Sequence, residues 1–380
     1  MDKSLADTLT TWRRHLHTHP ELSLQEAQTA AFVCARLAEL GVPFTANVGG
    51  HGVVATLNRG GSNRAVGLRA DMDALPITES TGVPYASANP GVMHACGHDG
   101  HTASLLGAAA LLAQDASWSG TVHFVFQPAE EGYSGAKSML ADGLLTRFPM
   151  ERIFGYHNWP GLEAGTVMLH DGPVMASGAR VIITLRGHAG HAAMPHLTRD
   201  PVLAAAHVLV ALQSIVSRAV DPLDAAVLSI CMIEGGLAAN QIPQQAVMRG
   251  TFRTLRRTVR DQMEADIRRI AEGIAQSFGM AADAEIRHGM GNTTNTKPEA
   301  ELAARAAAGA GLTVRRDLPP SMASEDFGWY LEEIPGAFAW IGNGPSTGGR
   351  ELHNPNFDYN DSILPVAATF LASTAKAALR

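Results

Sequence analysis

Short apolar runs that alternate with helical stretches constrain this chain most, because this alternation predicts a sheet of strands joined by helices. Residues 53–57, 65–68, 121–126 and 152–156 have the length and composition of strands. The run 121–126 is almost continuously apolar, as in a strand that is buried on both faces. Residues 101–114 predict an apolar helix. The first part of the chain is therefore predicted to form an α/β domain with helices on both faces of its sheet.

The pattern changes after Gly172-Pro173, where a second domain is predicted to begin. Its elements follow the order β-α-β-β-α-β of a ferredoxin-like unit, with strands and helices expected at residues 179–186, from 200 onward, 226–234, 246–254, 259–278 and 284–288. A helix and a strand at 337–341 then resume the first pattern. We therefore predict a discontinuous first domain, residues 1–178 and 290–380, interrupted by a second domain at 179–289.

Composition and charge exclude several classes of protein. A chain of 380 residues suits two or three domains. Its formal net charge of −7 offers no basic surface for a phosphate backbone, so no nucleic-acid partner is expected. Three scattered cysteines are too few for a disulfide framework, and the N-terminus lacks the apolar core of a signal peptide. The apolar run 103–113 falls short of the ~20 residues of a membrane span. We expect a cytoplasmic protein with no membrane partner.

The segment 94–101, HACGHDGH, concentrates chemistry directly before the predicted apolar helix. A single histidine is most often an ordinary core or surface residue. A cluster of three histidines with Cys96 and Asp99 is different, because thiol, imidazole and carboxylate groups are the ligands that divalent metals bind. Too few cysteines lie nearby for a structural zinc site with four Cys or two Cys and two His ligands. The segment therefore indicates a metal site of mixed ligands.

Further acids and imidazoles follow the predicted strands. In isolation, paired carboxylates at a strand end are often only a solvated turn. In α/β folds, however, ligands bind outside the carboxyl ends of the strands. The residues that follow strands in this way are Asp71 and Asp73, Glu130 and Glu131, His157, and, through a glycine-rich loop, His353. We expect these side chains to meet the 94–101 segment at one edge of the sheet.

The second domain carries its own candidates. The run 187–196, GHAGHAAMPH, is rich in histidine, but nothing near it supplies acids for a second metal site. We favour a loop histidine that acts as an electrophile. Arg253 lies on a predicted strand of the same domain, where an arginine is usually a surface residue. Its guanidinium could also bind a substrate carboxylate in bidentate fashion.

These residues lie in segments that resemble the motifs of the M20 family of metallopeptidases and amidohydrolases. Within it, the chain is most similar to the branch of aminoacylases, hippurate hydrolases, indole-acetyl-amino-acid hydrolases and N-acetyl-diaminopimelate deacetylases. The matching segments, which cover nearly the whole chain in order, are RRHLH (13–17), HPEL (19–22), LRADMDALP (68–76), MHACGHD (93–99), QPAEEG (127–132), the run 187–200, SEDF (324–327) and HNPNFD (353–358). The resemblance implies a zinc-peptidase-like catalytic domain with a central mixed sheet, interrupted by a ferredoxin-like lid domain that dimerises.

The resemblance implies two divalent metal ions per subunit, Zn or Mn with Co or Ni as alternatives. The implied ligands are Cys96, His98, Glu131, His157 and His353. Cys96 is expected to bridge the two ions. Thiolate and imidazole suit Zn, whereas carboxylate-rich sites also accept Mn, so this mixed set leaves both open.

The resemblance also implies roles for the neighbouring acids. Glu130 is expected to be the general base, because one carboxylate must stay off the metal to take the proton of the attacking water. Asp71, with Asp73 beside it, is expected to support the metal site from behind. Asp73 and Asp99 are suitable acceptors for imidazole N–H groups.

In the lid, the resemblance implies that His191 and Asn240 approach the substrate and that Arg253 binds its carboxylate. His191 could supply the hydrogen-bond donor that a tetrahedral oxyanion needs. The lid is also expected to join two subunits, as a homodimer or a higher homo-oligomer.

Together these features predict a binuclear metal-dependent amidohydrolase that cleaves N-acyl amino acids, its small-molecule substrates. An aminopeptidase or dipeptidase on the same scaffold is the first alternative, but it needs acids to hold a free α-amine, and we see no spare acidic cluster. A non-catalytic binding protein stabilised by metals is the second alternative. A structural site keeps every coordination position filled and needs no free glutamate beside it.

Overall fold

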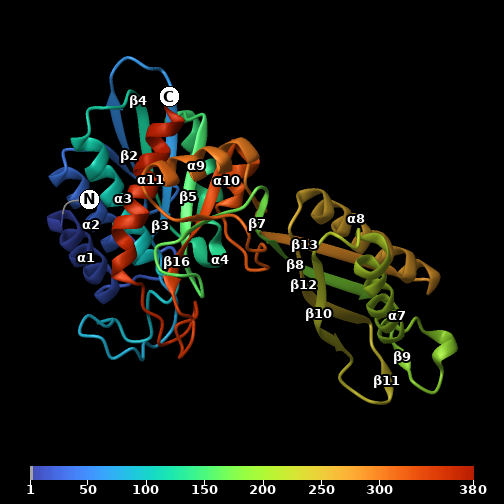
Figure 1. Ribbon diagram of the computed structural model, residues 1–380. Helices are drawn as coiled ribbons and strands as arrows, with labels where there is room; N and C mark the ends of the chain where they lie inside the picture. The colour runs from blue at the N-terminus through green and yellow to red at the C-terminus, as the bar shows by residue number, and fades with distance from the viewer. Residues whose placement is uncertain (1–2) are drawn as a thin grey trace. The chain divides into compact units, whose positions relative to one another are not determined.

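The computed structural model describes residues 3–380, which form two compact units (Figure 1). The larger unit contains the chain up to Val174 together with Thr294–Pro319 and Asp326–Arg380. The smaller unit contains Met175–Thr293 and Pro320–Glu325. The smaller unit thus begins before residue 179 and ends after residue 289, because its first and last long strands, Ser177–Arg186 and Ala281–Met290, extend beyond the range that the sequence pattern indicates. It also includes a short segment, Pro320–Glu325, that the sequence assigns to the first domain.

The larger unit is built on an eight-stranded sheet in the order β1-β2-β4-β3-β5-β16-β6-β15. The strands are β1 (Phe44–Val48), β2 (Gly52–Arg59), β3 (Ala65–Asp71), β4 (Gly120–Gln127), β5 (Arg152–Pro160), β6 (Val167–Leu169), β15 (Val314–Arg315) and β16 (Gly336–Gly344). Strands β4, β3, β5 and β16 run parallel, whereas β2 is antiparallel to both β1 and β4. The sheet is therefore mixed, and the predicted strands are confirmed.

Helices cover both faces of this sheet. The helices are α1 (Lys3–Thr18), α2 (Ala27–Glu39), α3 (His98–Gln114), α4 (Glu130–Tyr133), α5 (Gly135–Ala141), α6 (Leu144–Arg147), α9 (Lys297–Gly309), α10 (Gly328–Glu333), the 3-10 turn η3 (Asp361–Ile363) and α11 (Leu364–Ala378). Alternate residues of β3, such as Leu68, belong to the core shared with α1, α2, α3, α9 and α11. On the opposite face, Phe338 of β16 packs against Phe327, just before α10, with ring centroids 4.8 Å apart.

Helix α3 lies at the centre of the larger core, and small residues let its neighbours approach closely. Nearly all of its side chains are buried. A Cβ atom at Gly107 would lie 2.7 Å from a methyl group of Leu9 in α1 and 3.0 Å from Ala368 in α11. The glycine thus lets both helices pack directly on α3. This packing fixes the position of the α3 N-terminus, where the metal-ligating motif lies.

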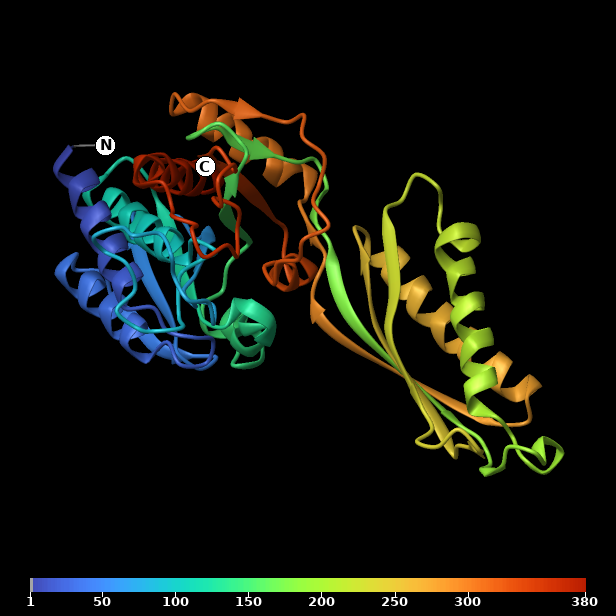
Figure 2. The same ribbon diagram turned by 90° about the horizontal axis from the view of Figure 1, so that it is seen from below.

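The smaller unit is a four-stranded antiparallel sheet in the order β10-β12-β8-β13, with two helices on one face (Figure 2). Its elements are β8 (Ser177–Arg186), the 3-10 turn η1 (Pro195–Leu197), α7 (Pro201–Ser214), the π-helical turn η2 (Ile215–Ala219), β10 (Ala226–Gly235), β12 (Gln245–Thr254), α8 (Arg257–Ser277) and β13 (Ala281–Met290). The carboxylate of Asp200 accepts hydrogen bonds from the first free amides of α7. The predicted ferredoxin-like order is confirmed.

Short strands complete the structure. Strands β9 (Gly190–His191) and β11 (Gln241–Ile242) pair with each other in the smaller unit, and β7 (Pro173–Met175) and β14 (Thr293–Thr294) lie on the two connecting segments. One continuous stretch among residues 3–380, Pro201–Ala219, is long and apolar enough to cross a membrane by length and composition alone. Its inner residues, including Val208 and Leu212, belong to the buried core of the smaller unit.

Candidate metal centre

The turn that carries Cys96 and His98 is positioned by glycines at the start of α3. Gly97 has a φ of +90°, in the left-handed region, and a Cβ atom there would overlap the side-chain amide of Asn158. The absence of a side chain lets Asn158 Nδ2 donate to the carbonyl oxygen of Cys96 at 2.6 Å. Gly100, one turn later, lies directly against the ring of Tyr359. The sequence CGHDG thus holds a thiol and an imidazole at the carboxyl end of β5.

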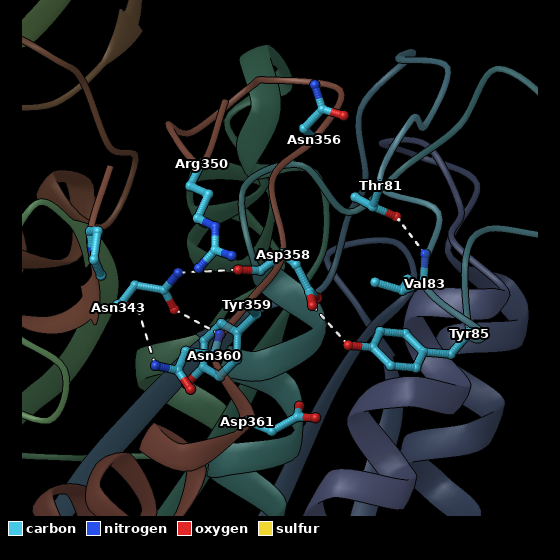
Figure 3. Close-up of a pocket in the computed structure, with 11 residues that line it drawn as sticks. Thr81, Val83, Tyr85, Asn343, Arg350, Asn356, Asp358, Tyr359, Asn360 and Asp361 are labelled. Atoms are coloured by element: carbon cyan, nitrogen blue, oxygen red, sulfur yellow. Dashed lines mark hydrogen bonds between the residues drawn. The ribbon is translucent and has the colours of Figure 1, made fainter. Parts of the chain in front are cut away.

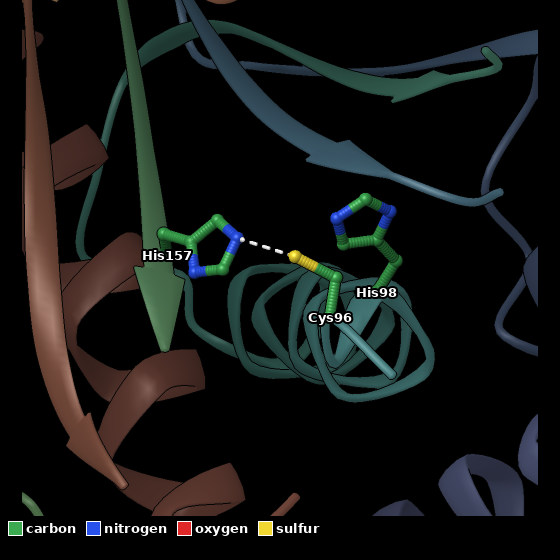
Figure 4. Close-up of side chains that lie close together, drawn as sticks. All are labelled: Cys96, His98 and His157. Atoms are coloured by element: carbon green, nitrogen blue, oxygen red, sulfur yellow. Dashed lines mark hydrogen bonds between the residues drawn. The ribbon is translucent and has the colours of Figure 1, made fainter. Parts of the chain in front are cut away.

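Three of the predicted ligands form a buried group. Cys96 Sγ lies 3.3 Å from His157 Nε2, and Figure 4 shows the sulfur between the rings of His157 and His98. The donor atoms of Cys96, His98 and His157 all lie within 4.8 Å of one another. Nε2 of His98 forms no hydrogen bond within residues 3–380. These atoms have the chemistry and the spacing that a divalent cation requires.

A second group shares Cys96 with the first. Its other members are Glu131 and His353, and the donor atoms of the three residues again lie within 4.8 Å of one another. His353 Nε2 lies 3.2 Å from Glu131 Oε1. The structure thus brings all five predicted ligands together in two groups that meet at one sulfur. This arrangement suits two cations and a bridging thiolate.

The electrostatics of the site favour bound cations. Burial raises the pKa of the Cys96 thiol well above its usual value, and the charges of Glu131 and Glu130 raise it further. Burial alone would lower the pKa of His98, but Asp71 and Asp73 outweigh it and raise this pKa to about 10. The metal-free centre therefore binds protons at atoms that a metal needs. Metal binding must displace those protons, which makes metal affinity pH-dependent.

Asp71 lies behind the metal centre, where hydrogen bonds hold its carboxylate in place. It accepts hydrogen bonds from Arg69 at 2.8 Å and from His101 Nδ1 at 2.6 Å, and its Oδ2 lies 3.6 Å from His98 Nε2. Burial alone would raise the pKa of Asp71, but His98 and Arg69 hold it well below the usual value. Asp71 is thus an anion next to His98, in the supporting position that the sequence predicts.

Asp73 contacts the backbone more closely than it contacts an imidazole. Its two carboxylate oxygens accept hydrogen bonds from the amides of Glu130 at 3.0 Å and Glu131 at 2.9 Å, and one of them also accepts from Ser23 Oγ at 2.7 Å. His98 Nδ1 lies farther away, at 3.4 Å. Asp73 therefore ties the loop of the two glutamates to the end of β3, a contact that the sequence analysis did not foresee.

Asp99 also has a partner outside the predicted set. It accepts hydrogen bonds from His17 Nδ1 at 2.8 Å and from Arg13 at 3.4 Å, both on α1. Burial alone would lower the pKa of His17, but hydrogen bonds to Asp99 and Glu79 raise it to about 9. Asp99 does accept from an imidazole, as predicted, but this imidazole belongs to the N-terminal motif rather than to a ligand.

The same network continues into a polar cavity of about 420 Å³ (Figure 3). Arg13 pairs with Asp358 at 2.8 Å, and the Tyr85 hydroxyl donates to Asp358 at 2.7 Å. None of the five predicted ligands lines this cavity. It is therefore separate from the metal centre, although the Arg13–Asp99 contact connects the two.

Glu130, the predicted base, lies beside the ligand groups. Its donor atom, that of His98 and that of Glu131 lie within 4.8 Å of one another. Glu130 is buried, and its Oε1 accepts a hydrogen bond from the amide of Asp326 at 3.3 Å. The loop turns at Ala129, whose φ of +55° lies in the left-handed region. This turn at the end of β4 delivers both glutamates to the same place.

Sequence reasoning missed a buried arginine that organises this region. Arg69 of β3 donates to Gln127 at 2.8 Å, to Asp71 at 2.8 Å and to Asp326 at 2.9 Å. Asp326 in turn accepts from the Gln127 side chain and from the amide of Ala136. A charged residue at an interior position of an apolar strand was the available signal, since buried charges are normally paired.

In the smaller unit, the structure brings together two of the three predicted lid residues. His191 pairs with Gln241, and the amide of Ala192 donates to the carbonyl oxygen of Asn240 at 3.0 Å. Arg253 lies at the far end of β12, eight residues beyond Gln245, or roughly 26 Å along the strand. Within this unit, Arg253 therefore does not share a site with His191 and Asn240.

Comparisons with known proteins identify the family of the chain and agree with its fold. The profile of Peptidase family M20/M25/M40 matches residues 67–377. The chain is 42% identical to an N-acetyl-L-cysteine deacetylase of Bacillus subtilis over 96% of its own length and 86% of the relative. It is 40% identical to a hippurate hydrolase of Campylobacter jejuni over 96% and 94% of the two chains. A dinuclear metal-binding peptidase of the M20 family from Bacillus subtilis has 37% identity and a TM-score of 0.87, with 100% and 99% of the chains covered. The chain belongs to the M20 family and is one of its metal-dependent amidohydrolases.

Proposed function

We propose that the protein uses two divalent metal ions to hydrolyse the amide bond of N-acyl amino acids, releasing a carboxylic acid and a free amino acid. The names of the relatives at about 40% identity support this substrate class. The observation that carries the proposal is the pair of ligand groups that meet at Cys96, with Glu130 beside them. A structural metal site has no need of this additional buried carboxylate.

The proposed ligands are Cys96, His98, Glu131, His157 and His353. When bound, two divalent ions polarise the scissile carbonyl and lower the pKa of a water molecule toward ~7. Zn suits the thiolate and imidazoles, and Mn, Co and Ni are the other candidates. Asp71 keeps His98 oriented, and Asp73 keeps Glu131 and Glu130 in register.

Glu130 is the proposed general base. Its carboxylate takes a proton from the attacking water and transfers it to the leaving amine. The amide of Asp326 holds one of its oxygens, while Asp73 holds its backbone amide. These contacts leave the carboxylate few orientations, so it is preorganised for proton transfer.

Glu130→Gln tests this role directly. The variant should retain the metal content of the wild type by elemental analysis and lose at least about 100-fold in kcat, in line with general-base catalysis. Glu131→Gln is the matched comparison and should lose metal. A Glu130→Gln enzyme that turns over N-acetyl amino acids at the wild-type rate would exclude Glu130 as the base. Assays with N-acetyl and N-benzoyl amino acids beside free dipeptides would distinguish the amidohydrolase from a dipeptidase.

We also propose roles for the smaller unit. His191 is the proposed donor to the developing oxyanion and Asn240 a substrate contact, while Arg253 binds the substrate carboxylate. Because Arg253 lies roughly 26 Å from the other two along β12, one substrate would meet Arg253 of one subunit and His191 and Asn240 of a second copy. Arg253→Ala should raise KM for substrates with a free carboxylate and leave a neutral amide unaffected.

The smaller unit is the proposed subunit interface. Strand β10 pairs with β12 on one side only, and apolar side chains are exposed along it and on α7. Val210 on α7 and Met232 and Ile233 on β10 are examples. An exposed edge with apolar neighbours favours pairing with a second copy. Val210→Glu combined with Ile233→Lys should convert a dimer to a monomer by light scattering after size-exclusion chromatography.

A further inference from the structure

The loop that carries the two catalytic glutamates has its backbone amides bound by the protein's own carboxylates. The amide of Ala129 donates to Glu26 Oε1 at 2.8 Å. The next two amides, those of Glu130 and Glu131, donate to the two oxygens of Asp73. Three consecutive N–H groups therefore end on two buried anions. Successive amides around a left-handed residue form a concave anion-binding site, and here Glu26 and Asp73 fill it.

Glu26 does not play the role that its position at the start of α2 predicts, which is to cap that helix. It is the N-cap residue of α2, yet its side chain makes no cap hydrogen bond. Glu21 supplies the cap instead, accepting from the amides of Gln28 at 3.2 Å and Thr29 at 2.8 Å. The Glu26 carboxylate is fully buried, and its Oε1 accepts from the amide of Leu24 at 3.0 Å as well as from that of Ala129. Burying a carboxylate costs free energy, and capping of α2 does not explain why one is buried here.

The whole segment between α1 and α2 supports this contact. Leu22 forms a parallel bridge with Ala74, directly after Asp73, and the amide of Ala74 donates to the carbonyl oxygen of Glu21 at 2.8 Å. Ser23 Oγ donates to Asp73 at 2.7 Å. The N-terminal motif HPEL, with Ser23 and Glu26 after it, therefore lies along the glutamate loop and the end of β3.

We propose that Glu26 is a positioning residue for the general base: it fixes the peptide before Glu130 and thereby sets where the Glu130 carboxylate lies. This inference rests on the proposed function of Glu130. Within residues 3–380, the Glu26 side chain hydrogen-bonds to the amides of Leu24 and Ala129 and to none of the predicted ligands, so it acts through Ala129. Because Ala129 has a φ of +55°, which is strained for a residue with a Cβ atom, an external contact is needed to hold it there.

The state of Glu26 guides the choice of variants. Burial raises its pKa, and the charge of Asp73 raises it further, so a neutral side chain should be tolerated. Glu26→Gln keeps an oxygen that can accept from Ala129 and adds an amide that can donate to a neighbouring carboxylate. Glu26→Met has a similar volume but no acceptor, so the amide of Ala129 would be left without its partner. Glu21→Ala removes a carboxylate from the same segment without touching the loop.

The experiment compares these three variants with the wild-type enzyme loaded with Co²⁺. Glu26→Met should lose about 10–100-fold in kcat with KM unchanged, the range observed for residues that orient a metal centre from outside it. Its cobalt content and its thiolate-to-cobalt absorption band should match the wild type, because Cys96 is not disturbed. Glu26→Gln should restore kcat to within a few fold. Glu21→Ala should lower the thermal midpoint without lowering kcat.

Glu26→Leu provides a second variant if Glu26→Met does not fold, and it should lower kcat in the same way because it also removes the acceptor of the Ala129 amide. A kcat equal to that of the wild type in either variant would overturn the inference. So would a loss of cobalt or a fall in kcat that Glu21→Ala reproduces. Failure of the proposed function would look different. In that case the wild-type enzyme would itself be inactive on every N-acyl amino acid, whatever the cobalt spectrum of Glu26→Met.

Discussion

Replacing Arg69 with methionine tests whether the buried ionic network supports the larger unit. Arg69 is fully buried, and its three donor nitrogens each reach an acceptor at 2.8 or 2.9 Å. Two of these acceptors are carboxylates, Asp71 and Asp326, which are themselves buried. Methionine fills much of the same volume and provides no charge. The substitution therefore isolates the loss of the guanidinium from a change in packing.

The expected magnitude follows from the charges that remain. Removing one partner of a buried ion pair costs about 3–5 kcal/mol, because the other charge stays buried without compensation. Arg69→Met removes the guanidinium from two carboxylates, but Asp71 keeps His98 and His101 beside it and Asp326 keeps its hydrogen bonds from Gln127 and Ala136, so we expect a loss at the lower end of this range, about 3 kcal/mol. Arg69→Lys keeps the positive charge but lacks the planar guanidinium that donates to several acceptors at once. Its free energy of unfolding should fall by about half as much. Adding Asp326→Asn to Arg69→Met should recover part of the loss by removing one uncompensated charge.

Urea unfolding of the metal-free protein, followed by tryptophan fluorescence, measures this difference. All five tryptophans lie in the larger unit, so the signal reports that unit alone. Metal is removed because ions bound to the folded state would add their own stabilisation. A loss below about 1 kcal/mol for Arg69→Met would show that the network contributes little and would refute the reasoning from buried charges.

Two further predictions concern the packing around α3. The pKa of His17 is raised to about 9, above the ordinary histidine value of about 6.5. Its pairing with Asp99 therefore stabilises the folded state fully below pH ~6.5, and this stabilisation is lost as the pH rises through 9. The free energy of unfolding of the wild type should therefore exceed that of His17→Gln at pH 6 by more than at pH 10; a gap that is constant with pH would contradict the assignment. A Cβ atom at Gly100 would overlap the ring of Tyr359, so Gly100→Ala should cost about 1–3 kcal/mol by overpacking, with Gly273→Ala on α8, where nothing lies within 4 Å, as the tolerated control.

Much of the fold follows from sequence patterns with a direct physical cause. Apolar runs of strand length predict β2, β3, β4, β5 and β16, and the Asp200-Pro201 pair predicts the start of α7. Strands β6 and β15, with three and two residues, are too short to leave such a pattern. The antiparallel direction of β2 depends on its pairing with β4, which local sequence does not encode.

The part of the site that lies at the ends of strands could be predicted from the sequence. The rule that ligands gather at carboxyl ends of strands brought Glu131 and His157 next to the Cys96 turn. It could not reveal contacts between distant positions, such as Arg69 with Asp326, 257 residues apart. Nor could it reveal that Asp73 binds backbone amides, because that contact depends on the left-handed turn at Ala129.

The two ligand groups differ in how far water can reach them. His353 has a side chain that is 52% exposed, whereas Cys96, His98 and His157 are buried. An ion bound by Cys96, Glu131 and His353 would exchange with the medium faster than its neighbour, because water reaches the His353 imidazole directly. Dilute chelator should then remove one equivalent quickly and the second slowly, yielding enzymes with a different metal in each position.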